Sequence, residues 1–571
     1  MRYLGFFFNH KLDWEPHVST MCNRARASIK ALQVLGNTHR GLSMANWRLV
    51  FNAVCLPVLS YGGQLWATSR KYKTLIKKIQ LIFNEGVKVI SGAFRTAPRE
   101  ALHELTRVLP ARLFFDKLTQ TSALRLYRIP PTSQFFPRLG GEWAKVVLGS
   151  SHTSSGGAPN VTATTHSTPR RPTQRPTALE ALGARVSAHG PRADVVVVPL
   201  WEVPIWEAKL DHLGVSRLQE QKKWVDDLYQ DLPTLDAVII CVAGTISNRG
   251  RHDNLLVGGS ATILTTHREE VVRNQTRHWG LGTEVVQNDV ALFGLAKAAE
   301  WLDSYYSDRT APKHIYMLCQ NSSALQGITK TSSYDNQVSV LLFHRSLTSF
   351  CSQHRDVGIT LVWSPVHRNR IQDTTVRLKA MEACTLTPRA SLNRVQSAAY
   401  QKQVTRQRTF SKWAEEWQEE RRKRYSRDSF AYEYALTQPP NGQNHLLWKA
   451  AVDKTEGVPS FSCHTTTTAL QLTVGHAFIS DYTRHFRPDI PEDENYCACG
   501  FPDHSFHHVL YNCPRYVGAC ISAGGLRQWD DESPLYYFRD YYSSRQFLDF
   551  LQISRAAFLP PQRAAGPFDP G

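Results

Sequence analysis

Three cysteines and a histidine near the end of the sequence have the spacing of a metal site. Cys497, Cys499, His508 and Cys513 follow the pattern C-x-C-x8-H-x4-C within 17 residues. Thiolates and an imidazole in a set of four suit tetrahedral Zn²⁺. Gly500 follows the second cysteine and permits the tight turn that such a ligand pair needs. Because four protein ligands leave no position for an activated water, we predict a structural zinc site.

Two neighbouring histidines leave the identity of the fourth ligand open. His504 and His507 compete with His508 for this role, and chance clustering of buried free thiols is the alternative to a metal. The chain holds 11 cysteines in 571 residues, so three within 17 favour zinc. Their odd number and scattered positions argue against a disulfide framework and indicate a reducing compartment.

Basic residues are concentrated at the start of the chain. The whole sequence has 67 Lys and Arg against 49 Asp and Glu, a net charge of +18 and a pI of about 9.4. Residues 1–130 alone hold 20 basic residues against 6 acidic ones. Such a field favours a phosphate backbone, whose counterions it releases. We therefore predict nucleic acid as the partner, with an ordinary solvated basic face as the alternative.

Three apolar runs at helical spacing carry these charges: residues 21–35, which Gly36 ends, 44–59 and 72–90. The third run alternates lysines with Leu and Ile and predicts an amphipathic basic helix. Trp47 and Tyr72 are available for base stacking, although such residues usually belong to a core. The residues that we predict to contact phosphates are Arg24, Arg26, Lys30, Lys73, Lys77, Lys78 and Lys88.

The middle of the chain changes character twice. Residues 145–193 are rich in Ser, Thr, Pro, Gly and Arg, a composition typical of a linker, and order returns at residues 195–198. From about 235 to 380, predicted strands at 237–241, 261–264, 315–318 and 359–363 and a helix at 290–302 indicate an α/β sheet domain. Residues 395–436 predict a long charged helix that bridges domains or binds a protein partner.

The ends of the chain and its hydropathy exclude further classes. No apolar run approaches the roughly 18 residues that span a bilayer, so we expect no membrane insertion. Residues 1–8 have too short an apolar stretch for a signal peptide and are typical of a strand. The segment beyond residue 555 is expected to be disordered. We expect an intracellular protein, nuclear or cytoplasmic.

Several motifs together resemble the C-terminal half of a LINE-type (non-LTR) retrotransposon reverse transcriptase polyprotein, especially those of fungi. Residues 3–5, 11–14 and 17 resemble the end of the polymerase palm, and residues 22–26, 47–50, 56–62, 90–96 and 124–128 resemble its thumb. Residues 475–478, 486–488 and the Cys/His cluster resemble the family's C-terminal zinc knuckle.

The resemblance implies a multidomain α+β protein with a helical thumb, an α/β ribonuclease H-like sheet domain and a small C-terminal helical region with the zinc knuckle. We expect the palm end and basic thumb at 1–140, a disordered linker at 141–193 and a degenerate ribonuclease H-like domain at 194–385. A charged helical connector at 386–445, the knuckle region at 446–555 and a disordered tail at 556–571 complete the predicted layout.

Two departures from the family concern catalysis. No Tyr/Phe-x-Asp-Asp element occurs in the chain, which therefore looks like a truncated copy without nucleotide transfer. Ribonuclease H chemistry needs three or four carboxylates around two Mg²⁺ ions. The resemblance places those positions on Ala243, Ala291, Gln320 and Arg377, so no catalytic residue and no Mg²⁺ is expected. The family's Trp-x-Pro-Gly-His turn corresponds to residues 363–367, where His367 is expected to be a turn or core residue.

Three other carboxylates lie near these positions in the sequence. Asp236 begins its strand, at the wrong end for the site, and Asp289 would need a shift of roughly 200° around its helix. Asp373 is the third. We therefore predict a nucleic-acid-binding fragment that binds RNA, DNA or their hybrid. An active RNA–DNA hybrid ribonuclease, a protein-binding scaffold and a pseudogene product are the alternatives.

Overall fold

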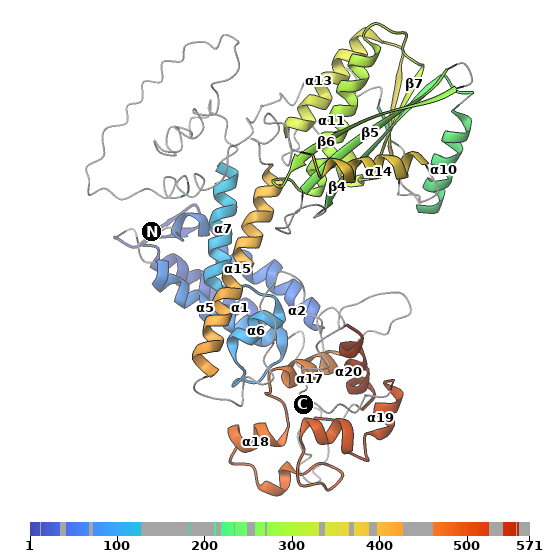
Figure 1. The fold of residues 1–571 in the computed structure, drawn as a ribbon. Coiled ribbons are helices and arrows are strands. Elements are labelled where there is room, and N and C mark those ends of the chain that lie inside the picture. Colours follow the sequence, from blue (N-terminus) through green and yellow to red (C-terminus); the bar gives the residue numbers. More distant parts are fainter. Residues whose placement is uncertain are drawn as a thin grey trace. The chain divides into compact units, whose positions relative to one another are not determined.

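The computed structural model describes residues 1–11, 13–34, 42–67, 72–126, 182, 210–212, 218–232, 234–247, 257–268, 271–329, 337–364, 371–386, 397–425, 461–524, 541–554 and 557–558. The chain divides into two compact units. We call residues 1–119 with 406–571 the helical unit, and residues 120–405 the sheet unit. Figure 1 shows the helices and strands of both. The predicted linker apart from residue 182, residues 195–198, His367 and the tail beyond 558 lie outside the described residues. Ala557 and Phe558, within the predicted disordered tail, are buried in the core.

The helical unit opens with a short hairpin and a basic helix. Strands β1 (Arg2–Tyr3) and β2 (Phe6–Phe7) pair antiparallel, so the predicted strand is two short ones. Helix α1 (Glu15–Gln33) follows, with Pro16 in its first turn, where a missing N–H costs nothing. Its buried side includes Val18, Ala25 and Ile29. The predicted run at 21–35 is therefore a helix that begins six residues earlier.

The second apolar run is interrupted rather than continuous. It forms α2 (Met44–Val50), a π-helical turn (Phe51–Cys55) and α3 (Leu56–Ser60), and α4 (Gly63–Trp66) follows. Pro57 has no N–H to donate to the preceding turn. Pro57 stands in the first turn of α3, where its ring is tolerated. This helix directly follows the wider π-helical turn.

Helix α5 (Tyr72–Ser91) is the amphipathic helix that the third run predicts. Its buried face includes Leu75, Ile79, Phe83 and Val87, at the i, i+4 spacing of one helical side. Two shorter packing helices follow, α6 (Arg99–Thr106) and α7 (Ala111–Leu126). His103 of α6 is fully buried, and burial lowers its pKa to about 4, so it is a neutral part of the core.

The C-terminal elements belong to the same core as these N-terminal helices. They are α15 (Ala398–Tyr425), α17 (Cys463–Thr473), α18 (Ser480–Phe486), a 3-10 turn (Glu492–Asn495), a π-helical turn (His508–Asn512), α19 (Val517–Ser522) and α20 (Tyr541–Ser554). One continuous apolar cluster contains Phe83 of α5, Trp417 of α15, Leu470 of α17 and Phe547 of α20. Segments that lie more than 300 residues apart in sequence thus fold as one body.

The predicted charged helix at 395–436 is helical over the described residues 398–425. Its two tryptophans, Trp413 and Trp417, are buried. Its Lys412 Nζ lies 3.3 Å from Asp116 Oδ2, and Glu416 pairs with Arg112 of α7. The apolar side of this helix therefore packs within the chain.

The sheet unit is built on one mixed sheet. Its elements are β3 (Leu210–His212), α10 (Leu218–Asp231), β4 (Ala237–Ser247), β5 (Val257–Arg268), β6 (Val271–Gly282), α11 (Gln287–Tyr306), β7 (His314–Cys319), α12 (Ser322–Ile328), α13 (Gln337–Gln353), β8 (Gly358–Trp363) and α14 (Ile371–Ala383). The strand order is β3-β8-β7-β4-β5-β6. Strands β4, β5 and β6 pair antiparallel, whereas β3, β8, β7 and β4 run parallel.

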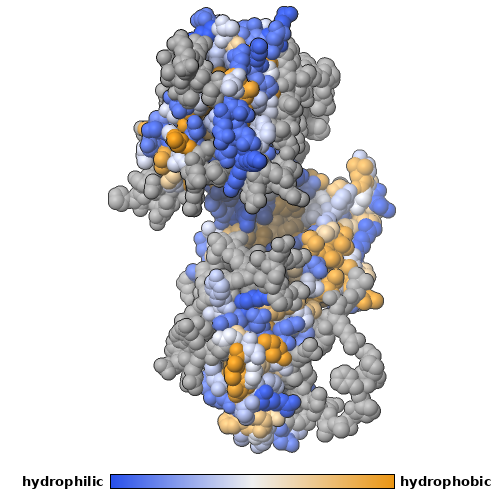
Figure 2. Space-filling model, turned by 90° about the vertical axis from the view of Figure 1, so that its right-hand side faces the viewer, coloured by the Kyte–Doolittle hydropathy of each residue, from blue (hydrophilic) through white to orange (hydrophobic). Residues whose placement is uncertain are grey.

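Alternation along β4 explains why helices cover both faces of the sheet. Val238, Ile240 and Val242 pack into the core with α11, α12 and α13, and Ile239, Cys241 and Ala243 pack with α10 and α14. Both faces are thus apolar, as the continuous run of the sequence predicts. Figure 2 shows hydrophilic side chains gathered on the side of this unit where α10 lies in Figure 1.

The four predicted strands and the predicted helix of this region are confirmed as β4, β5, β7, β8 and α11. Strand β6 corrects the prediction, in which residues 271–282 formed no strand. Residues 274–278 of this edge strand are all exposed and polar. With no apolar residue on either face, they show no alternation from which a strand could be recognised. No helix among the described residues combines the length and apolar character of a membrane span.

We predict that Gly86→Ala destabilises the helical unit. A Cβ at Gly86 of α5 would lie 2.2 Å from Cε2 of Phe51, whose side chain is only 3% exposed and has no room to withdraw. Overpacking of this kind costs about 1–3 kcal/mol. Gly518→Ala in α19 is the control, since a Cβ there meets nothing within 4 Å. Denaturant unfolding should show a lower midpoint for the first variant alone, and equal midpoints would contradict the packing.

Candidate metal centre and nucleic-acid interface

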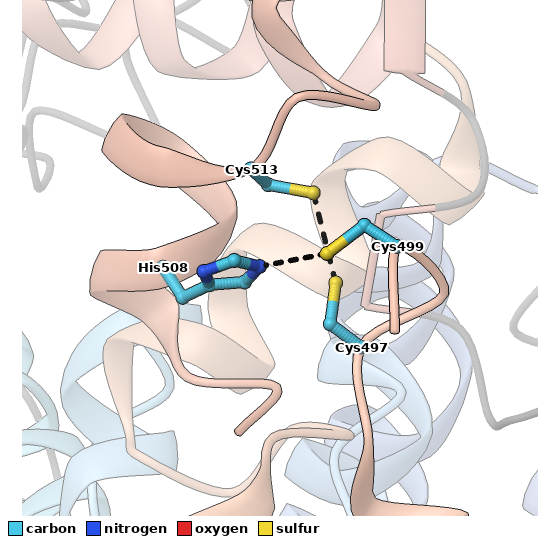
Figure 3. A group of neighbouring side chains, drawn as sticks. All are labelled: Cys497, Cys499, His508 and Cys513. Atoms are coloured by element: carbon cyan, nitrogen blue, oxygen red, sulfur yellow. Dashed lines mark hydrogen bonds between the residues drawn. The ribbon is translucent and has the colours of Figure 1, made fainter. Parts of the chain in front are cut away.

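The four residues of the predicted zinc site come together in the structure. One ligand atom from each of Cys497, Cys499, His508 and Cys513 lies within 4.8 Å of the other three. The Sγ atoms of Cys497 and Cys513 are 3.6 Å apart, and Cys499 Sγ lies 3.2 Å from His508 Nε2. Figure 3 shows the side chains converging on one point. Four ligands at 2.0–2.3 Å from a tetrahedral ion lie about 3.5–3.8 Å from one another. The separations in the cluster, 3.2 Å to at most 4.8 Å, bracket this range, so the four side chains could hold a metal such as zinc.

The backbone around the cluster explains this convergence. The N–H of Gly500 donates to the carbonyl of Cys497, and the N–H of Cys497 donates to the carbonyl of Phe501, both at 2.8 Å. Gly500 has φ +90°, a conformation that other residues avoid. His508 begins a π-helical turn, and Cys513 directly follows that turn. The ring of Phe501 stacks on His508 at 4.4 Å and fixes the orientation of the imidazole.

The thiols differ in acidity before any metal binds. Burial raises the pKa of Cys497 to about 12 and also raises the pKa of Cys513. Burial opposes ionisation of Cys499 as well, but hydrogen bonds from the backbone of Phe501 and from the other two thiols outweigh it and lower its pKa. Cys499 is therefore the first of the three thiols to supply a thiolate. A bound cation would deprotonate the others, because a coordinating thiol loses its proton.

The structure separates His508 from its two competitors. His504 lies against Phe558, with 5.8 Å between ring centroids. His507 is exposed, lies against Tyr511 and has Nδ1 3.3 Å from Asn512 Nδ2. Neither belongs to the cluster. Since three histidines lie within five residues, only the direction of each side chain could decide among them.

The basic residues chosen from the sequence lie on α1 and α5, and two of them are tied to carboxylates. Arg26 makes a bidentate ion pair with Glu85, with Nη2 to Oε1 at 2.9 Å. Lys78 pairs with Glu15. These two cations connect α1 to α5, so part of their charge is already compensated within the unit. Exposed pairs of this kind contribute about 0–1 kcal/mol to stability.

Four of the other predicted cations are exposed: Arg24, Lys30, Lys73 and Lys77. The guanidinium of Arg24 lies over the ring of Phe7, 5.5 Å from its centroid. Among the residues that the structure describes, none of the four has a carboxylate partner. Lys88 near the end of α5 is half-buried, and burial, followed by the charges of Arg99 and Arg95, lowers its pKa. Those two arginines were not predicted to contact phosphates, because they stand outside the three apolar runs at helical spacing.

Three of the four positions aligned with ribonuclease H ligands lie around the middle of β4, and the fourth, Arg377, is an exposed residue of α14. Ala243 continues β4 just beyond its pairing with β7, which ends at Val242 and Cys319, and Gln320 follows Cys319. A Cβ at Gly244 would lie only 2.9 Å from the backbone nitrogen of Ala291. Ala243 also shares a core cluster with Val376 of α14, the neighbour of Arg377. Ala243 and Ala291 are buried, with 2% and 1% of their surface exposed.

The nearby carboxylates occupy other places. Asp236 precedes the first residue of β4. Asp289 accepts a hydrogen bond from Val286 N at 3.1 Å in the first turn of α11 and another from the hydroxyl of Ser397. Asp373 is fully buried, and Cys241 Sγ donates to its Oδ1 at 3.5 Å. Asp289 and Asp373 are therefore engaged at helix N-termini, where a carboxylate is favourable.

Comparison with curated proteins gives one partial match. The chain is similar to the probable RNA-directed DNA polymerase from transposon X-element of Drosophila melanogaster, with 27% identity over 122 residues. The match covers 21% of this chain and 13% of that protein, so the chain spans a small part of the relative's length. No protein-family model matches the chain.

Solved structures of reverse transcriptases and ribonucleases H also show a likeness. The prototype foamy virus protease-reverse transcriptase matches 26% of this chain and 21% of its own length, with 11% identity and a TM-score of 0.21. LC9-RNase H1, a type 1 RNase H with the type 2 active-site motif, matches 30% of this chain and 81% of its own, with 14% identity and a TM-score of 0.22. LC11-RNase H1 in complex with RNA/DNA hybrid matches 26% of this chain and 96% of its own, with 14% identity and a TM-score of 0.20.

We predict that the purified chain binds one Zn²⁺ and that Cys513→Ser and His508→Ala abolish this binding. The reason is that each variant removes one of four converging ligands. Metal content and competition with a chromophoric chelator measure the effect. Cys520→Ser and His507→Ala are matched controls, since Cys520 donates to the carbonyl of Leu510 instead and His507 is exposed. Equal zinc content in all four variants would contradict the assignment.

Proposed function

We propose that this chain is a nucleic-acid-binding part of a LINE-type retroelement reverse transcriptase polyprotein that performs neither nucleotide transfer nor ribonuclease H catalysis. It binds RNA, DNA or their hybrid through the basic side of α1 and α5, and a zinc ion at Cys497, Cys499, His508 and Cys513 stabilises its C-terminal region. The partial similarity to a transposon RNA-directed DNA polymerase supports the retroelement origin.

The observation that carries the binding proposal is the set of exposed cations on α1 and α5 without a carboxylate partner among the described residues. Lys73 and Lys77 lie one turn apart at the start of α5, and Arg24 and Lys30 lie on α1. Like charges on one unit repel each other, which lowers its stability unless a polyanion compensates them. The phosphate backbone of a nucleic acid provides that compensation and releases its own counterions.

The inactive ribonuclease H-like site rests on the chemistry of its side chains. Mg²⁺ requires hard oxygen ligands, usually carboxylates, and none of Ala243, Ala291 and Arg377 has an oxygen in its side chain. The remaining position, Gln320, has a neutral amide. Asp289 and Asp373 make hydrogen bonds within the fold instead. Without two metal ions there is neither an activated water nor neutralisation of the leaving oxygen.

The zinc ion that we propose has a structural role. All four ligands come from protein, so no position is open for water or substrate. Cys497 and Cys513 belong to the apolar core that also contains Phe83 of α5. Binding a metal that the unfolded chain cannot hold equally well stabilises the folded unit. Chelation should therefore lower the stability of the helical unit.

We predict that the chain binds nucleic acid with an affinity that falls steeply with salt, and that Lys73→Ala with Lys77→Ala weakens binding and lowers the salt slope by about 2. Fluorescence anisotropy with labelled single strands, duplex and RNA–DNA hybrid measures both quantities. Lys222→Ala with Lys223→Ala is the matched control, because these adjacent lysines of α10 lie one turn before Asp226 and Asp227.

Two outcomes would contradict the binding proposal. An affinity that does not change with salt, or none at all, would favour a protein partner or a chain without a selected function. Equal losses in the α5 variant and in the α10 control would show that net charge alone, rather than the surface of α1 and α5, determines the affinity.

We predict that the chain does not hydrolyse an RNA–DNA hybrid with Mg²⁺ or Mn²⁺, although it binds the hybrid. A labelled hybrid on a denaturing gel, with an active ribonuclease H as the positive control, tests this. Metal-dependent cleavage that persists through purification and disappears in Asp373→Asn or Asp289→Asn would overturn the proposal. It would mean that these carboxylates form a new metal site.

A further inference from the structure

A second group of cations lies where α5 ends and α6 begins. Lys88 is in the last turn of α5, and Arg99 is the first residue of α6. The chain between them is compact: Gly92 has φ +61°, its N–H donates to the carbonyl of Lys88 at 2.8 Å, and Ala97 N donates to Phe94 O at 3.1 Å. Arg95 stands in this turn and is exposed, as is Arg99. We call Lys88, Arg95 and Arg99 the turn patch.

Among the residues that the structure describes, no carboxylate forms an ion pair with a cation of the turn patch. Glu85, one turn before Lys88, is bound in a bidentate pair to Arg26 and exerts only the weakest of the influences on Lys88. The turn between α5 and α6 brings Arg95 and Arg99 near the end of α5 that carries Lys88, and their charges add to burial in lowering the pKa of Lys88. A group of like charges held together in this way favours an anion.

The turn that carries Arg95 is held in place by the C-terminal elements. Gln471 Nε2 of α17 donates to the carbonyl of Gly92 at 2.9 Å. Thr96 Oγ1 lies 2.9 Å from His476 Nδ1 and 2.9 Å from Tyr482 Oη. These contacts attach the turn at both its ends.

Aromatic packing adds to these hydrogen bonds. The ring of Phe94 lies 4.9 Å from Phe478 and 5.2 Å from Tyr482, between ring centroids. A short loop without such contacts samples many conformations, and ordering it when a ligand binds costs free energy. Contacts that order the loop in advance remove that cost. The C-terminal elements therefore order the turn before any ligand binds.

We propose that the turn patch is a binding site for the backbone phosphates of a nucleic acid, and that residues 471–482 hold it in its binding conformation. The proposal rests on the function proposed above and adds to it a second contact surface, separate from Lys73 and Lys77 at the other end of α5. Guanidinium groups suit this role, because their planar fork donates two hydrogen bonds to one phosphate.

The first test neutralises the arginines. Arg95→Ala with Arg99→Ala in the full chain should raise the Kd for labelled single-stranded RNA on the order of tenfold at low salt and reduce the salt slope by about 2. Arg484→Ala with Arg487→Ala is the control, since both arginines are exposed on the C-terminal region and paired with carboxylates. Unchanged affinity in the first variant, or equal losses in both, would overturn the proposal.

The second test removes the support without changing any charge. Thr96→Val deletes the hydroxyl that meets His476 and Tyr482 and keeps the shape of the side chain, so affinity should fall roughly three- to tenfold. It should fall no further when Thr96→Val is added to the double arginine variant. Thr20→Val is the control, because its hydroxyl donates to the carbonyl of Pro16, within its own helix. A loss that adds fully to that of the arginine variant would contradict the supporting role.

Two comparisons identify which proposal has failed. If the unaltered chain binds no nucleic acid, the proposed function fails; if it binds but the arginine variants bind equally well, only the turn patch fails. Competition with inorganic phosphate, at an ionic strength matched with chloride, distinguishes the ligands. Displacement of RNA by millimolar phosphate beyond the chloride control would show a site for single phosphate ions and overturn the proposal in favour of a small anion.

Discussion

The packing of the C-terminal elements against the first hundred residues is the constraint on which the helical unit depends. The two segments share one apolar cluster, which contains Ile79 and Phe83 from α5, Leu470 from α17 and Phe547 from α20. Burial of apolar side chains is the main favourable term in folding, and it is shared here across a large gap in sequence. The Cys/His cluster contributes to the same body through Cys497 and Cys513. A metal at this cluster would therefore stabilise the basic helices as well as its own surroundings.

The two units contrast in what their polar residues do. In the sheet unit, the positions around Ala243 and Ala291 are filled by small apolar side chains, and Asp289 and Asp373 make hydrogen bonds at helix N-termini. These hydrogen bonds stabilise the fold, because buried carboxylates without partners are costly. In the helical unit, exposed cations stand without carboxylate partners among the described residues. The unit thus has a surface suited to a polyanion, and its core includes Cys497 and Cys513 of the Cys/His cluster.

Periodicity and spacing in the sequence were enough to predict much of the architecture. The i, i+4 apolar spacing of α5 and the apolar runs of β4, β7 and β8 depend only on local geometry, so these elements were predicted correctly. The Cys/His spacing brought four ligands within 17 residues and likewise needs little tertiary information. Strand β6 was missed, since its exposed polar residues form a strand only through pairing with β5. The π-helical turn at residues 51–55 depends on the surrounding packing in the same way.

The sequence by itself therefore determined the local elements, the excess of basic charge and the set of possible zinc ligands, because each follows from neighbouring residues. The tertiary structure decided what depends on residues far apart. It selected His508 over His504 and His507, tied Arg26 to Glu85, and placed Thr96 against His476 and Tyr482. Side-chain direction and long-range pairing set these outcomes, and one-dimensional spacing contains neither. The arginines of the turn patch were not predicted, because they lie outside the apolar helical runs and their position beside Lys88 depends on the turn between α5 and α6.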